Sequence, residues 1–244
     1  MKSALVTGAS RGIGRGIALR LAGKGYGLTI TSRKDGDLQV LEQELVAAGA
    51  PKVVRHAADM ARRDCLPALI AAHEDGFGAM NALVVNAGVG TAGKVADYDL
   101  KRLDKTLEVN FACAVVLIKK SLPMLRTAAA EDPVRGARII GVSSITGAYA
   151  EPGLAVYGAS KAALLSLLET VNLEESARGV TASAIAPAFV DTDMSDWVTD
   201  RIPKDEMIPV EDVVRVVDML LELSANTVVN RIVLSRKGTN GYSA

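Results

Sequence analysis

The chain has 244 residues, 49% of them hydrophobic and 23% charged, so it can bury one sizeable core. Its 28 basic and 28 acidic residues cancel, which argues against a nucleic-acid partner or an anionic membrane surface. No apolar stretch is long enough for a membrane span, and the apolar run before Gly8 is too short for a secretory signal. We therefore expect a single domain, residues 1–244, that works in the cytoplasm on a small molecule.

The cysteines and histidines give no sign of a disulfide framework or a metal site. Cys65 and Cys113 are the only two cysteines, and their spacing fits a reducing compartment, with both thiols expected to be buried in helices. His56 and His73 have no partner ligands at metal spacing and are expected to be structural or surface residues. We predict no metal site.

Strand-like and helical patterns alternate along the chain. A buried strand at 3–7 precedes a helical pattern that begins at Ile13 and stops at Gly23. Further strands are expected at 27–32, 52–57, 81–88, 137–144, 180–187 and 230–235, and helices at 37–48, 62–74, 99–127, 154–177 and 210–223. The strands are apolar on both faces, which predicts an α/β fold: a doubly wound parallel sheet of Rossmann type. The polar segment 128–137 is expected to be a surface loop.

A glycine-rich turn joins the first strand to the first helix. Gly8, Gly12 and Gly14 follow the pattern G-x-x-x-G-x-G. At a helix N-terminus, unpaired N–H groups and the positive end of the helix dipole form an anion site, which would suit the pyrophosphate of a dinucleotide. Taken alone the glycine pattern is a weak signal, because a tight strand-to-helix connection would also explain it.

A second pattern lies in the other half of the chain. Tyr157 and Lys161 stand four residues apart in a predicted helix and so share a face. A free phenol has a pKa near ~10, and we expect the Lys161 ammonium to lower the pKa of Tyr157. Ser144, at the end of the strand 137–144, could hold a substrate oxygen against the phenol. This set predicts proton transfer to a carbonyl or from an alcohol, although a lone Tyr-x-x-x-Lys also occurs by chance.

Together these motifs resemble those of the short-chain dehydrogenase/reductase family, in its single-domain branch, over about residues 3–234. The matching segments are TGASRGIG at 7–14, Asn86-Ala87-Gly88, Asn110, Ser144, Tyr157-x-x-x-Lys161 and the late turn from Pro187 to Thr192, all in the family's order. The family's most frequent activity makes 3-oxoacyl thioester reduction the leading specific expectation.

The resemblance implies a role for each catalytic candidate. Tyr157 would be the general acid in reduction and the general base in oxidation, and Lys161 would hold the nicotinamide ribose. Ser144 would polarise the substrate carbonyl, and Asn110 would hold a water that links Lys161 to solvent. From the residues alone, Asn110 could equally be a helix-interior polar residue that bonds locally. The expected cofactor contacts are Gly8, Ser10, Arg11, Gly12, Ile13, Gly14, Ser32, Arg33, Asp59, Met60, Asn86, Ala87, Gly88, Tyr157, Lys161, Pro187, Val190 and Thr192.

The end of the second strand bears on the choice of cofactor. NAD enzymes of this fold carry an acidic residue there, whereas this chain has Ser32 followed by Arg33. Arg33 and Arg11 could pair with a 2′-phosphate, which favours NADP(H), although a solvated basic turn would also explain Arg33. Asp35 and Asp37 are expected to cap a helix that starts near residue 37.

Some positions leave alternatives open or depart from the family pattern. Asp59 would lie near the adenine, or would cap the next helix. Ala188 stands where the family has glycine after Pro187, and since alanine resists positive φ we expect a shifted backbone there. The C-terminus lacks the family's Asp-Gly-Gly ending, which puts the usual subunit contacts in doubt.

Two further expectations concern a lid and assembly. Segment 191–208 has weak periodicity and follows the nicotinamide turn, so we expect a lid, with an ordinary surface helix as the alternative. The helix 154–177 has more apolar residues than one packing face needs, which predicts a homo-oligomer, either a dimer or a tetramer. The surplus residues are Ala162, Ala163, Leu164, Leu165, Leu167, Leu168 and Val171.

The expected activity is that of an NADP(H)-dependent oxidoreductase acting on a carbonyl or a secondary alcohol. A nucleotide-binding regulatory or sensor protein on the same fold is the first alternative, but such proteins typically lose the Tyr or the Lys. An isomerase or epimerase that uses the cofactor transiently is the second, and it usually needs a longer chain. The sequence does not identify the substrate.

Overall fold

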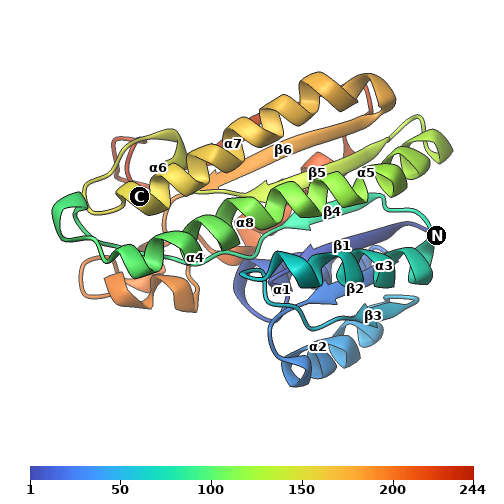
Figure 1. The fold of residues 1–244 in the computed structure, drawn as a ribbon, viewed down its shortest axis with the longest axis horizontal. Helices are drawn as coiled ribbons and strands as arrows, with labels where there is room; N and C mark the ends of the chain where they lie inside the picture. Colours follow the sequence, from blue (N-terminus) through green and yellow to red (C-terminus); the bar gives the residue numbers. More distant parts are fainter.

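The computed structural model describes all 244 residues and contains one seven-stranded sheet, in the order β3-β2-β1-β4-β5-β6-β7 (Figure 1). Its strands, all parallel, are β1 (Ser3–Thr7), β2 (Gly27–Thr31), β3 (Val53–Arg55), β4 (Ala82–Val85), β5 (Ala137–Val142), β6 (Val180–Pro187) and β7 (Arg231–Leu234). The strand order reverses between β1 and β4, which confirms the predicted doubly wound, Rossmann-type fold.

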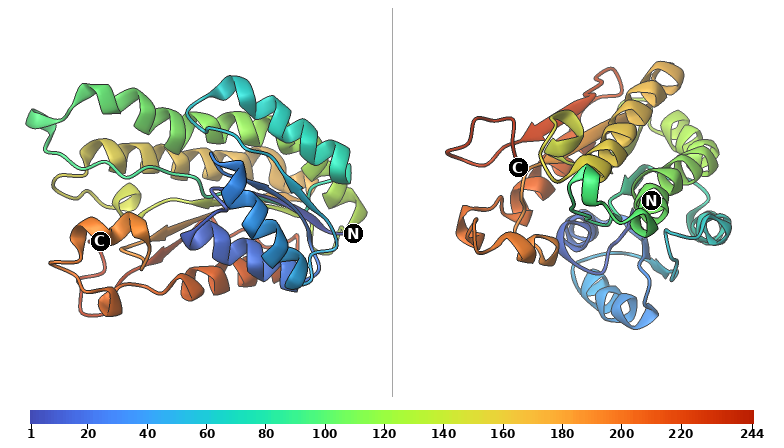
Figure 2. Two further views of the ribbon diagram at one scale, coloured as in Figure 1. Left: turned by 90° about the horizontal axis from the view of Figure 1, so that it is seen from below. Right: turned by 60° about the vertical axis from the view of Figure 1, so that its left-hand side comes forward.

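Helices cover both faces of this sheet (Figure 2). One face carries α3 (Leu66–Phe77), α5 (Cys113–Glu131) and α7 (Ala155–Glu175), and the other carries α1 (Gly12–Gly23), α2 (Asp35–Ala47) and α8 (Val210–Glu222). Two short helices, α4 (Leu103–Leu107) and α6 (Ile145–Ala148), complete the set. The two apolar cores contain 27 and 26 buried residues, so the sheet is covered about equally on both sides, as its strands' apolar character predicts.

Several predicted boundaries move. The loop expected at 128–137 is shorter, because α5 continues to Glu131: Ala128 and Ala129 favour helix and are buried. Helix α2 starts at Asp35 and not near residue 37. Cys113 is buried as expected, but Cys65 is only half-buried and lies in a 3-10 turn, Arg63–Cys65, where its thiol donates to the main-chain oxygens of Asp59 and Arg62.

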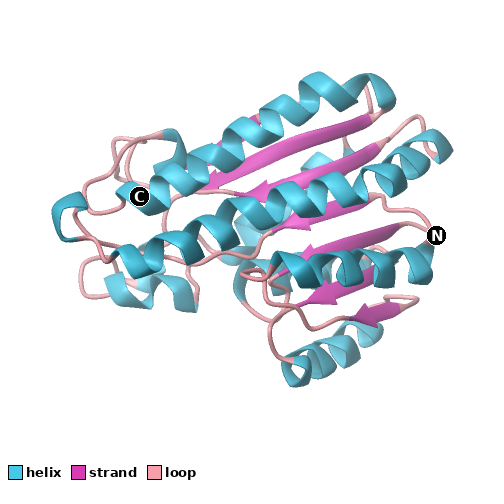
Figure 3. Ribbon diagram, viewed as in Figure 1, coloured by secondary structure: helices cyan, strands magenta, loops and turns pink.

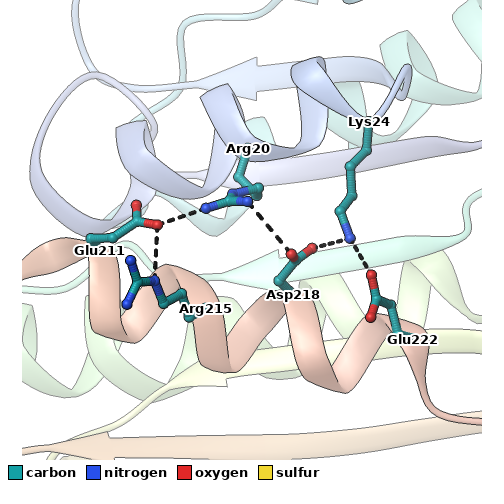
Figure 4. Close-up of polar contacts among 6 residues, drawn as sticks. All are labelled: Arg20, Lys24, Glu211, Arg215, Asp218 and Glu222. Carbon is teal, nitrogen blue, oxygen red and sulfur yellow. Dashed lines mark hydrogen bonds and ion pairs between the residues drawn. The ribbon is translucent and has the colours of Figure 1, made fainter.

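Helices α1 and α8 are joined by a line of ion pairs (Figure 4). Arg20 of α1 pairs with Glu211 at 2.6 Å and Lys24 with Glu222 at 2.6 Å, while Asp218 contacts both cations. The backbones approach closely because Gly16 has no side chain: a Cβ there would lie 2.9 Å from methyl groups of Val210 and Val214. Helix α8 is therefore docked firmly on the helix that begins at the glycine-rich turn.

All strands end at the same edge of the sheet, where long loops gather (Figure 3). The register places Thr7 opposite Thr31 of β2 and Val6 opposite Val84 of β4, so the segments after these strands start at similar heights. In Figure 1 the green loop near residue 95 and the orange segment near residue 200 both lie beyond the arrowheads. The sequence motifs thus converge at one edge. No helix has the length and apolar character needed to cross a membrane.

Candidate active site

The glycine-rich turn forms a close-packed cradle at the N-terminus of α1. Gly8 and Gly12 have positive φ values of 63° and 54°, which favour glycine. A Cβ on Gly14 would lie 2.2 Å from the Gly8 carbonyl oxygen, so only glycine fits there. No side chain caps α1, and its first turn holds no acidic residue, so its first N–H groups remain available for an anion.

Thr7 and Asn86 connect this turn to the loop after β4. The Asn86 amide donates to the main-chain oxygens of Thr7 and Gly8 at 3.0 and 3.1 Å. The Thr7 hydroxyl donates to Val84 and accepts from the N–H groups of Asn86 and Ala87. Asn86 therefore supports the cradle through its side chain. Thr7 was not among the expected residues, and a polar residue at the end of an apolar strand was the available signal.

Arg33 is the available cation at the end of β2. Its side chain is exposed and makes no ion pair, whereas Asp35 is already paired with Arg55 at 3.0 Å. Ser32 is half-buried, and its hydroxyl donates to the Lys34 main-chain oxygen. No carboxylate that could repel a 2′-phosphate stands at the Ser32 position, as the sequence indicated.

The other expected cofactor contacts differ in which of their atoms a cofactor could reach. Asp59 is exposed and accepts from the N–H of Ala61 in a local turn, so it does not cap α3. Met60 is 5% exposed and packs in the core, which leaves only its main chain to face a cofactor. Ser10 and Ile13 are half-buried within the glycine-rich turn and at the start of α1.

Arg11 has a partner that the sequence did not reveal. Its guanidinium pairs with Asp193 at 2.9 Å, across the mouth of the cradle, and both side chains are largely exposed. Beside this pair, a Cβ on Gly12 would lie 3.2 Å from the Thr192 methyl group. The segment after β6 therefore reaches over the glycine-rich turn.

Tyr157 and Lys161 lie on the same face of α7, as predicted, but their pKa values do not follow the expectation. The Lys161 Nζ lies 5.9 Å from the centre of the Tyr157 ring and donates to the Val142 main-chain oxygen at 2.9 Å. Burial lowers the pKa of Lys161 to about 8 and raises the pKa of Tyr157 above its ordinary value, with a hydrogen bond to Ser144 opposing that rise. The prediction of a lowered pKa for Tyr157 is wrong in this structure, because desolvation outweighs a cation directed at a carbonyl.

Ser144 caps α6 directly after β5. Its Oγ accepts from the main-chain N–H of Thr146 at 3.2 Å and from the Thr146 hydroxyl at 2.9 Å. The neighbouring Ser143 faces elsewhere and donates to the Lys161 main-chain oxygen at 3.0 Å, which ties β5 to α7. Ser144 lies at the carboxyl edge of the sheet, near enough to Tyr157 to influence the pKa of its phenol.

The amide oxygen and nitrogen of Asn110 both bond protein atoms. Its Oδ1 accepts from the Val89 N–H at 2.8 Å, and its Nδ2 donates to the Val89 oxygen and to Ser160 Oγ, each at 3.0 Å. A Cβ on Gly88 would lie 3.3 Å from Lys161 Nζ and 3.4 Å from Asn110 Oδ1, so these groups meet at one point. Asn110 also lies in a π-helical turn, Glu108–Ala112, a feature frequent at functional sites.

The late turn keeps an ordinary backbone despite Ala188. No residue other than glycine has a positive φ, so Ala188 adopts an ordinary backbone conformation, and its N–H pairs with the Leu234 main-chain oxygen at 2.8 Å. Pro187 and Val190 are buried and Thr192 is half-buried. Segment 191–208 forms 3-10 turns between ends joined at Val190 and Ile208, and so is not the regular helix offered as the alternative.

The fold and the site together define an oxidoreductase of Rossmann type. A family model described as short chain dehydrogenase matches residues 2–202. The protein belongs to the short-chain dehydrogenase family, which confirms the predicted family and enzyme class.

Similar proteins fit this assignment. 3-Oxoacyl-[acyl-carrier-protein] reductase FabG of Staphylococcus aureus is 35% identical over 209 residues, 85% of this chain and 81% of that protein. Among solved structures, an alcohol dehydrogenase from Thermococcus sibiricus complexed with 5-hydroxy-NADP has a TM-score of 0.86 and 26% identity, covering 98% of this chain and 97% of the other. A short chain dehydrogenase from Burkholderia cenocepacia J2315 in complex with NADP has a TM-score of 0.83 and 29% identity, covering 96% and 95%.

Proposed function

We propose that this protein is an NADP(H)-dependent carbonyl reductase, able to run in reverse as a secondary alcohol dehydrogenase. The observation that carries the proposal is the meeting of Ser144, Tyr157 and Lys161 at the edge of the sheet where the glycine-rich turn opens. A regulatory nucleotide-binding protein would not need this proton donor.

The residues of the cradle fit a dinucleotide. The uncapped N-terminus of α1 would hold the pyrophosphate, since Gly12 and Gly14 let the backbone approach. Arg33, exposed and unpaired, would bind a 2′-phosphate. The two solved structures reported above hold NADP or a hydroxylated form of it, in agreement with this choice. When bound, NADPH supplies the hydride that reduces the carbonyl carbon.

The side chains of the protein would donate and replace the proton that the reaction needs. The Ser144 hydroxyl donates a hydrogen bond to the substrate oxygen, and Tyr157 donates its proton to that oxygen as charge develops on it. A raised pKa keeps the Tyr157 phenol protonated at neutral pH, which suits its role as the acid in reduction. Lys161, whose pKa is lowered to about 8, would hold the nicotinamide ribose and return a proton to the phenol.

We propose that a relay water would bind the main chain of the π-helical turn, since the Asn110 side chain is already held by Val89 and Ser160. In a π-helical turn the main-chain hydrogen bonds shift by one residue, and such turns are frequent at functional sites. The role of Asn110 is then to hold Val89 and Ser160 around Lys161.

A 3-oxoacyl thioester is the substrate class that we propose first. Its support is the 35% identity to FabG, a 3-oxoacyl-[acyl-carrier-protein] reductase, over most of both chains. We also infer one catalytic domain over residues 1–244, since every strand belongs to a single sheet. A cytoplasmic location is consistent with the two free cysteines, because thiols stay reduced in that compartment.

Self-association is proposed through the outer faces of α5 and α7. Four of the seven apolar residues expected to be surplus on α7 pack on the sheet, which leaves Ala162, Ala163 and Leu167 at least partly accessible. Leu173 of α7 is 88% exposed and Val115 of α5 is 37% exposed. A light-scattering mass near that of the 25.5 kDa monomer would contradict this proposal.

The experiment for the activity is Tyr157→Phe, which removes the proton donor and almost no volume. NADPH oxidation is followed with a panel of 3-oxoacyl thioesters and simple ketones, and kcat is expected to fall by ~10²- to 10⁴-fold. NADPH binding should stay within about twofold of wild type, because a hydroxyl on the substrate side adds little to ground-state cofactor affinity. Retention of more than a tenth of wild-type kcat would show that Tyr157 is not the acid.

A further inference from the structure

The hydrogen bonds around Ser144 do more than cap a helix. A serine hydroxyl has two acceptor lone pairs and one proton. Both acceptor positions of Ser144 Oγ are taken by one residue, Thr146, whose N–H lies at 3.2 Å and whose hydroxyl donates at 2.9 Å. Both residues are 6% exposed, so little solvent competes for these positions.

We propose that Thr146 is a positioning residue for catalysis: by filling both acceptor sites of Ser144 Oγ, it leaves the Ser144 proton to be donated toward the reacting oxygen. Without the Thr146 hydroxyl, the Ser144 rotor could turn and present a lone pair to the carbonyl oxygen. The inference rests on the proposed carbonyl chemistry for its catalytic effect, but the orientation of Ser144 is a property of the protein alone.

Thr146 is itself fixed relative to the helix that carries Tyr157. A Cβ on Gly158 would lie 2.8 Å from the Thr146 main-chain oxygen, and a Cβ on Gly147 would lie 2.8 Å from the Lys161 carbonyl carbon. The two glycines let α6 and α7 touch through their backbones. The donor direction of Ser144 is therefore set before substrate arrives, which is the condition for electrostatic preorganisation.

Thr146→Val tests the role, because it removes the hydroxyl, keeps the main-chain N–H and changes the side-chain size little. We expect kcat to fall about three- to tenfold, as for loss of one neutral hydrogen bond, with NADPH affinity unchanged. Thr146→Ser keeps the donor and should retain kcat within about twofold. Equal loss in both variants, at unchanged Tm, would mean that the packing shape of the side chain and not specifically its hydroxyl matters, and would overturn the proposal.

A second experiment does not depend on catalytic activity. The Tyr157 phenol is titrated by ultraviolet difference spectroscopy against Tyr157→Phe, with circular dichroism as a check that the fold persists. The titratable groups near it are Lys161 on α7 and, next to Lys161, the Cys113 thiol on α5. Since the Ser144 hydrogen bond opposes the rise in the pKa of Tyr157, Thr146→Val should raise that pKa further and Thr146→Ser should not. An identical titration in wild type and Thr146→Val would overturn the proposal.

A double-mutant cycle separates action through Ser144 from a general structural effect. In the Ser144→Ala background, Thr146→Val should cause no further loss of kcat. A further loss equal to that in the wild-type background would show that Thr146 acts independently of Ser144. If wild type reduces none of the carbonyls, the proposed function fails, while the phenol titration still decides whether Thr146 orients Ser144.

Discussion

Arg33→Ala is expected to remove most of the preference for NADPH while leaving NADH binding almost unchanged. Arg33 is exposed at the end of β2 and makes no ion pair, so no internal partner must be given up when a phosphate binds. The neighbouring acid Asp35 is paired with Arg55 and does not compete strongly for it. The full interaction of the guanidinium with the 2′-phosphate is therefore available to binding.

The magnitude follows from this difference in partners. A charge-assisted hydrogen bond contributes ~1.5 to 3 kcal/mol, and an exposed site belongs at the lower end, so losing Arg33 should weaken NADPH binding about tenfold. Arg11 must first leave Asp193, and an exposed pair of that kind is worth ~0.2 to 1 kcal/mol. Arg11→Ala should therefore cost less than Arg33→Ala, and Asp193→Asn should tighten NADPH binding by up to about fivefold.

Dissociation constants for NADPH and NADH, measured by fluorescence titration at fixed salt, decide the matter. Lys34→Ala is the matched control, because Lys34 is the adjacent exposed cation and also makes no ion pair. It should weaken NADPH binding less than Arg33→Ala, since a flexible ammonium lacks the planar fork of arginine. A wild type that binds NADH as tightly as NADPH, or an Arg33→Ala variant that loses both equally, would refute this account of the pocket.

Three further outcomes are expected. Burial lowers the pKa of His73 from 6.5 to about 4. Between these pH values the unfolded chain binds a proton that the folded protein does not. The free energy of unfolding should therefore fall by about 3 kcal/mol as the pH drops from 6.5 to about 4. Urea unfolding across the window checks this, and His73→Gln should flatten the slope. Amides of segment 191–208 should exchange with deuterium faster than those of β4, and equal protection would contradict a lid. Asp218→Asn, which breaks the contacts with Lys24 and Arg20, should cost about 1 kcal/mol at low salt and less at high salt, by thermal unfolding.

The features that the sequence predicted well are those determined by local patterns. Gly8 and Gly12 sit at positive φ, and Gly14 tolerates no side chain, so these positions carry their signal in the residue type itself. Alternation of apolar strands and helices likewise follows from which faces must be buried. The i, i+4 spacing placed Tyr157 and Lys161 on one face of α7 because helix geometry requires it.

Features that depend on distant partners were missed. The pKa of Tyr157 rises because packing buries the phenol, and Lys161 points to Val142, a contact set by tertiary structure. Arg11 looked like a free phosphate ligand, yet its partner Asp193 is 182 residues away in sequence. Ala188 does not have a positive φ, in line with the expectation that alanine resists it, but the position of the turn relative to a cofactor depends on tertiary contacts that the sequence does not reveal.

Segment 191–208 is attached to elements that would bind the cofactor, and these attachments limit how the segment can move. Its two ends are joined by main-chain bonds from Ile208 to Phe189 and from Asp191 to Ile208, each at 2.9 Å, so any opening of the segment would leave this base joined. Near one end of the segment Asp193 pairs with Arg11 of the glycine-rich turn, and the other end runs directly into α8, which is docked on α1 (Figure 4). An anion that draws Arg11 away from Asp193 would therefore release the contact between this segment and the glycine-rich turn, while the main-chain bonds at its base stay in place.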